Sequence, residues 1–181
     1  MAYTAIDDPE AYFQTVIYTG NGSANNAITL PGDTDMQPDL VWIKNRDATD
    51  SHCLFDAVRG ATKVIHSNAG TVESTDTDTL DSFTSDGFQV DADVKVNTNA
   101  EDYVAWCWKE SATSGFDIVT FTGTGTTANI SHGLSVAPKM IIVKSKTGAS
   151  GWRVYHDGIG ATKALVLDTT AAADGSIDYW N

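Results

Sequence analysis

The stretch YFQTVIYTGNG at residues 12–22 decides the fold, because it returns as GFDIVTFTGTG at residues 115–125. Both copies alternate apolar and polar side chains up to a glycine turn, which is typical of a half-buried β-strand. Two further landmarks recur in the same order: PDLVWIK (38–44) as PKMIIVK (138–144), and GATK (60–63) as GATK (160–163). The copies lie 103 residues apart at the first landmark (12 to 115) and 100 at the others (38 to 138). The sequence therefore predicts a tandem repeat with one small deletion.

The repeat divides the chain into a first β-sandwich domain at 1–110 and a second, truncated one at 111–181. The first copy continues through SDGFQV (85–90) and YVAWCWK (103–109), whereas the second stops at YWN (179–181). We expect the second copy to lack the counterparts of two strands. Either the polypeptide continues, or a partner strand or neighbouring subunit covers the open sheet. We therefore do not expect the isolated chain to be a stable monomer.

Short segments rich in β-branched and aromatic residues lie between turn dipeptides such as NG (21–22) and DG (86–87). Strands at intervals of this kind are typical of antiparallel sandwiches, and the sequence predicts almost no helix. The predicted strands cover residues 12–18, 40–45, 52–57, 63–66, 86–90, 103–109, 116–122, 139–145, 152–156 and 163–167.

The charge of the chain excludes several classes of partner. There are 24 acidic and 11 basic side chains, which gives a net charge of −13. Binding to nucleic acid or to an anionic membrane surface needs clusters of Lys and Arg, so we expect neither. The longest apolar runs are too short to span a bilayer, and the N-terminus does not resemble a signal peptide. We expect synthesis in a cytoplasm.

The sequence offers no convincing catalytic motif. A glycosidase needs two carboxylates facing one bond, and the nearest same-face acidic pair is Asp91 and Asp93, without a third acid beside it. Serine-hydrolase and phosphate-binding motifs are absent from the sequence, so we predict that the protein is not an enzyme. A weak calcium candidate is the loop with Asp76, Asp78 and Asp81, although a solvated acidic loop is the favoured interpretation. We expect no other cofactor.

The aromatic residues could bind sugar or belong to the core. Alternation places Val104, Trp106 and Trp108 on one face of a strand and Tyr103, Ala105 and Cys107 on the other. The tryptophan face is either a sugar-stacking platform or, as we favour, part of the core. A separate carbohydrate-binding candidate consists of Trp152, His52, with which the repeat aligns it, and Tyr155. Cys53 and Cys107 are expected to be buried free thiols.

The strings quoted above, with SHGLSVAPKMIIVK (131–144), resemble a domain family repeated in virion proteins of marine bacteriophages. The resemblance covers essentially the whole chain and implies a concanavalin-like or jelly-roll β-sandwich in a phage structural protein. Relatives of this kind sit in tail-fibre-like or other particle proteins and supply no catalytic residues to carry over. The chain departs from their pattern near Tyr179, where relatives continue through the rest of the repeat.

From these observations we expect a bacteriophage virion structural protein that is part of a tail fibre or spike, attaches to the tail and adheres to the host. The alternatives are a capsid decoration protein and a carbohydrate-binding lectin module. The expected partners are further copies of the chain, as in a homotrimer, other virion or tail proteins, and a host surface glycan. The expected location is the virion, assembled in the host cytoplasm.

Overall fold

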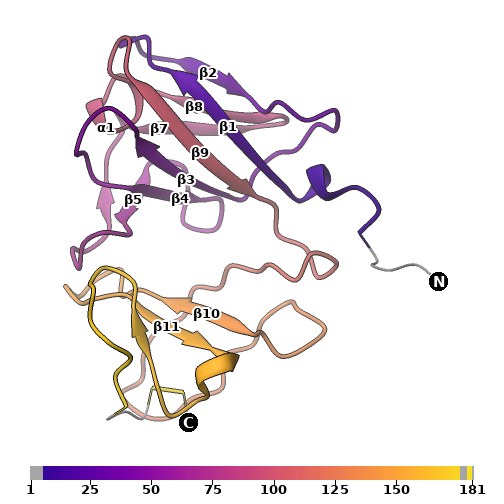
Figure 1. Cartoon of the computed structure of the whole chain (residues 1–181), viewed down its shortest axis with the longest axis vertical. Coiled ribbons are helices and arrows are strands. Elements are labelled where there is room, and N and C mark those ends of the chain that lie inside the picture. The colour runs from indigo at the N-terminus through magenta and orange to yellow at the C-terminus, as the bar shows by residue number, and fades with distance from the viewer. Residues whose placement is uncertain (1–5, 176–178, 181) are drawn as a thin grey trace.

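The computed structural model describes residues 6–175, 179 and 180, and it consists mainly of antiparallel strands (Figure 1). The N-terminal part, residues 6–110, contains β1 (Phe13–Thr19), β2 (Asn26–Thr29), β3 (Leu40–Asn45), β4 (Cys53–Asp56), β5 (Lys63–His66), β6 (Ser74–Thr75), β7 (Leu80–Thr84), β8 (Gly87–Val90) and β9 (Asp102–Trp108). The C-terminal part, the described residues from 111 onward, contains β10 (Met140–Val143), β11 (Arg153–His156) and β12 (Leu165–Val166). The helical segments of the described residues are η1 (Pro9–Ala11), α1 (Val94–Asn97) and η2 (Asp157–Ile159). The predicted antiparallel β fold with almost no helix is confirmed.

Two sheets of the N-terminal part share one core. The larger has the strand order β1-β9-β3-β4-β5-β6, and the smaller has the order β2-β8-β7. Buried apolar side chains from both sheets form a single cluster, in which Phe55 of β4 and Phe88 of β8 are fully buried. This cluster holds most of the apolar core of the described chain.

Strand β9, which lies between β1 and β3, has one face in the core and one outside it. Tyr103, Ala105 and Cys107 are fully buried, whereas Trp106 and Trp108 on the opposite face are half-buried. The predicted alternation is therefore confirmed, but the expectation that the tryptophan face belongs to the core is wrong. Close packing against the second sheet favours small side chains beside Tyr103, so the bulky indoles lie on the outer face.

A glycine shapes the turn between β7 and β8, at the predicted DG dipeptide. Gly87 has a φ of +132°, which side-chain-bearing residues rarely adopt. A Cβ atom there would lie 2.1 Å from the carbonyl oxygen of Ile28 on β2. The absence of a side chain lets β8 approach β2 closely enough to pair.

The C-terminal part contains a three-stranded sheet with the order β10-β11-β12 (Figure 1). These strands confirm the predictions near 139–145, 152–156 and 163–167, whereas the strand predicted at 116–122 is wrong. That described segment is coil apart from an isolated bridge between Ser111 and Phe116. In the N-terminal part the matching strand β1 pairs only with β9. No described strand stands beside 116–122 in that role, so its backbone has no ladder to join.

The sequence patterns also missed three strands, β2, β6 and β7. No helix within the described ranges is long and apolar enough to cross a membrane.

Candidate interaction site

The open side of β10 is the first element of the candidate site. β10 lies at one end of its sheet and pairs with β11, from Met140 opposite His156 to Val143 opposite Arg153. On its other side, the described residues supply no strand. Unpaired N–H and C=O groups along such an edge form a template for a further strand.

The C-terminal part also exposes many large apolar side chains. Val136 is 73% exposed and Met140 is 52% exposed. Burying one such side chain contributes about 1.5–3 kcal/mol, so a surface of this kind favours association. The exposed set among the described residues is Val119, Phe121, Ile130, Val136, Met140, Ile142, Leu165, Leu167 and Tyr179.

A buried tryptophan joins the C-terminal sheet to the N-terminal part. Trp152 is 3% exposed and packs with Leu54 of β4 and Ile65 of β5. Its Nε1 donates hydrogen bonds to the carbonyl oxygens of His66 (2.9 Å) and Ala69 (3.1 Å). We call this contact the seam, and it holds the open edge in a fixed place beside the larger sheet.

Two backbone hydrogen bonds reinforce the seam. The N–H of Glu73 donates to Lys146 and the N–H of Ser150 donates to Gly70, both at 2.9 Å.

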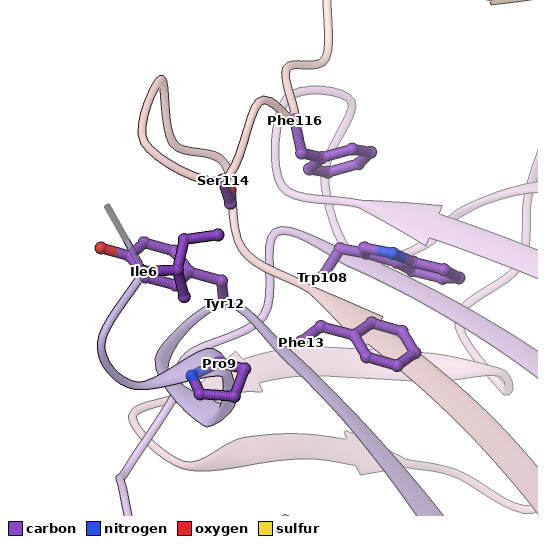
Figure 2. Close-up of a pocket in the computed structure, with 7 residues that line it drawn as sticks. All are labelled: Ile6, Pro9, Tyr12, Phe13, Trp108, Ser114 and Phe116. Atoms are coloured by element: carbon purple, nitrogen blue, oxygen red, sulfur yellow. The ribbon is translucent and has the colours of Figure 1, made fainter. Parts of the chain in front are cut away.

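The outer face of the larger sheet has an aromatic groove of about 250 Å³. Figure 2 shows the ring of Trp108 between those of Phe116 and Phe13, and Phe13 and Trp108 come from neighbouring strands. The ring centroids of Phe13 and Trp108 are 5.0 Å apart, and those of Trp108 and Phe116 are 6.2 Å apart. The groove is lined by Ile6, Pro9, Tyr12, Phe13, Trp108, Ser114 and Phe116. Such a lining suits an apolar side chain.

The three residues predicted to bind carbohydrate have different surroundings. His52 lines a cleft of about 360 Å³, together with Trp42, Ser67, Asn68, Leu167, Asp168, Thr169 and Thr170. Trp152 is buried in the seam, although its backbone N–H donates to Asp168 (2.9 Å), which lines the cleft. Tyr155 packs against Trp180 (5.7 Å between centroids) and is not a lining residue. Of the three, only His52 lines this cleft.

The structure does not bring the carboxylates of the acidic loop together as a group of metal ligands. Asp76 lies 3.8 Å from the ammonium of Lys95 and accepts a hydrogen bond from the N–H of Asp78. Partial burial, with Asp91 and Asp78 nearby, raises the pKa of Asp81. No group of three or more His, Cys, Asp or Glu that could hold a metal ion occurs within the part of the chain that the structure describes. The calcium candidate is therefore not supported.

Arg59 is a structural residue that the sequence patterns missed. Its guanidinium is 5% exposed, forms ion pairs with Asp56 and Glu73, and donates to the carbonyl oxygen of Leu54 (3.1 Å). Arg59 follows the strand β4 and ties it to β5 and to the segment before β6. In the sequence, Arg59 directly precedes the repeated GATK string at residues 60–63.

The two cysteines are free and buried, as predicted. Burial raises the pKa of both Cys53 and Cys107 to about 12. Both thiols are therefore protonated near neutral pH, and thiolate is the reactive form.

We expect neither thiol of the native chain to react with an aromatic disulfide reagent at neutral pH, and both to react fully after unfolding in urea. A raised pKa in the folded state also means that stability is intact below pH 9, the ordinary thiol value, and falls as the pH rises toward 12. Absorbance of the released aromatic thiolate measures reactivity, and urea titrations across that range measure stability. Rapid labelling of a folded sample would contradict the burial.

Comparison with known proteins gives one match. A family model described as a domain of unknown function (DUF7483) matches residues 8–181. No curated protein and no solved structure matches the chain.

Proposed function

The chain belongs to the DUF7483 family, and we propose that it is a non-enzymatic structural component of a bacteriophage virion, part of a tail fibre or spike. The observation that carries the proposal is the open edge of β10 together with the exposed apolar side chains of the C-terminal part. Both features fit a protein that works by assembling with other polypeptides. The resemblance of its sequence motifs to virion domains supplies the phage context.

The proposal includes two tandem units, 1–110 and 111–181, and the strand registers support them. Pairings of β3, β4, β5 and β6 recur 100 residues later around β10, β11 and β12. The corresponding pairs are Val41↔Phe55 with Ile141↔Tyr155, Leu54↔Ile65 with Val154↔Leu165, and Val64↔Ser74 with Ala164↔Asp174.

A hydrogen bond outside the ladders recurs at the same spacing. The N–H of His52 donates to the side-chain oxygen of Asn68 (3.0 Å), and the N–H of Trp152 donates to that of Asp168 (2.9 Å). Neither contact follows from strand pairing alone. Their recurrence supports two copies of one local design.

Burial differs between the two copies in a way that supports an incomplete second unit. Met36 is 1% exposed, whereas its counterpart Val136 is 73% exposed. Val16 and Tyr18 of β1 are buried, and their counterparts Val119 and Phe121 are exposed. The second unit thus has apolar side chains at the corresponding positions, but nothing among the described residues buries them as in the first unit.

The experiment that tests the virion assignment is labelling of purified particles of the encoding phage with an antibody against the chain. We expect label on tail fibres or spikes. Label on the capsid surface would favour the alternative of a decoration protein, and particles without the chain would refute both.

We expect the isolated chain to self-associate at micromolar concentration, and to form a homotrimer in a fibre, because the exposed apolar side chains lose contact with water on association. Analytical ultracentrifugation measures this directly. Val136→Asp should weaken association at least about tenfold, a change of about 1.4 kcal/mol. The control is Val58→Asp, at an exposed valine of the N-terminal part. A compact folded monomer would contradict the expectation.

The cleft beside His52 favours a second candidate function, glycan binding at the host surface. Trp42 brings an aromatic ring to this cleft, and its buried Nε1 has no acceptor among the described residues. Burial, and then the nearby Lys44, lower the pKa of His52, so its ring is neutral near pH 7. A glycan array probed with the assembled oligomer tests this function, and a screen without hits would dispose of it.

A further inference from the structure

We propose that the C-terminal sheet accepts one antiparallel strand with the side-chain pattern of β9, contributed by a partner polypeptide, along the open edge of β10. The inference rests on the tandem units of the proposed function and deepens it by naming the register and chemistry of the partner. The same strand would order residues 116–122 on its far side.

The first unit shows what belongs at this edge. β3 lies between β4 and β9, with Val41 opposite Cys107 and Ile43 opposite Ala105. β10 has the counterpart of β4, namely β11, in the same register. The vacant side of β10 therefore corresponds to the position of β9.

The backbone polarity of the edge follows from the same comparison. The N–H of Arg46, just after β3, donates to the carbonyl oxygen of Asp102 on β9. Alternate residues of a strand direct their N–H groups to the same side, so those of Trp42 and Lys44 face β9 as well. Their counterparts Ile142 and Lys144 present N–H groups to the open side of β10.

The segment 116–122, which corresponds to β1 and would flank the incoming strand on its far side, is already held at its start. In the first unit Gln14, near the start of β1, accepts a hydrogen bond from the N–H of Gly32 (2.8 Å). In the second unit Asp117, the counterpart of Gln14, accepts one from the N–H of Gly133 (2.7 Å). Residues 116–122 thus start in place and lack only the strand on which β1 depends, namely β9.

The pattern of the incoming strand is set by what it must pack against. Val41 and Ile43 are fully buried opposite Cys107 and Ala105, so the inward positions opposite Ile141 and Val143 require small, uncharged side chains. The outward position opposite Ile142 corresponds to Trp106 and takes a large aromatic ring. β9 itself, DYVAWCW (102–108), has this pattern.

A second copy of β10 suits the edge less well. The strand at this edge has to pair with β10 on one side and with residues 116–122 on the other, as β9 pairs with β3 and with β1. The other side of β10 is already paired with β11, so a second copy of β10 would offer residues 116–122 no free edge. This argues for a β9-type strand as the occupant.

The test uses the whole chain, labelled with ¹⁵N and ¹³C, and an unlabelled synthetic peptide of residues 99–110, NAEDYVAWCWKE. We expect the peptide to slow amide exchange at Met140 and Ile142 about tenfold or more, and also along 116–122, with β1 and β9 unchanged. The register predicts close α-protons between Ile141 and the peptide's Cys107 position, and between Val143 and its Ala105 position. The matched control peptide carries Ala105→Asp and Cys107→Asp, which place charges inward.

A second arm appends residues 99–110 after Asn181 through a flexible Gly/Ser linker, so that an insoluble peptide does not end the test. If amide exchange at Met140 and Ile142 is not slowed in either arm, the proposal is overturned. Protection of β10 that needs no peptide and rises with chain concentration would also overturn it, by showing that a second copy covers the edge. Neither readout involves the virion, so a failure here is distinct from failure of the particle labelling.

Discussion

Arg59→Ala is expected to lower the free energy of unfolding by about 3–5 kcal/mol, the usual cost of removing one partner from a buried ion pair. The guanidinium is 5% exposed and neutralises Asp56, whose side chain is 7% exposed. Its loss leaves that carboxylate buried without its cation. It also removes the donor to the carbonyl oxygens of Leu54 and Lys63. Urea denaturation followed by circular dichroism measures the effect.

The chain offers a matched control for this variant in Arg46. Its side chain is 47% exposed and lies 3.9 Å from an equally exposed Asp102. Exposed pairs contribute about 0–1 kcal/mol, so Arg46→Ala should change stability by no more than that. Equal effects of the two substitutions would show that the Arg59 cluster is solvated and that its burial does not matter.

A strand predicted from a local pattern forms only where a pairing partner exists. Residues 12–18 and 116–122 share the same alternation, yet only the first forms a strand, because β1 has β9 beside it. Propensity and periodicity describe one segment at a time, whereas a ladder needs two. The strands β2 and β7 were missed for a related reason: each is short and gains its order from pairing with β8.

The surfaces were harder to predict than the strands. Alternation in β9 separates two faces, but only packing against the second sheet decides that Ala105 and Cys107 face inward and the indoles outward. The ion pair of Arg59 with Glu73 joins residues that no short-range pattern links. The open edge of β10, by contrast, accords with the sequence-based expectation that the second copy lacks the counterparts of two strands.

Trp152→Ala should detach the C-terminal sheet while leaving the core of the N-terminal part folded. Replacing a buried tryptophan with alanine typically costs about 3–5 kcal/mol, and here the cavity opens between Leu54 and Ile65 in the seam. The carbonyl oxygens of His66 and Ala69 also lose their donor. Cleavage in residues 117–139 by limited proteolysis should accelerate strongly, while amide exchange in β3 and β9 stays slow.

Trp152→Phe separates the two contributions, because it keeps an apolar ring and removes the indole donor. We expect it to cost about 1–3 kcal/mol, the penalty for leaving buried acceptors unpaired. If the Trp152 ring instead contacts a glycan, its substitution should affect glycan binding and not stability. In that case Trp152→Ala would abolish binding on a glycan array and leave proteolysis and unfolding unchanged. Trp152 is only 3% exposed, which argues for its role in the seam. We therefore expect Trp152→Ala to change the proteolysis rate more than glycan binding.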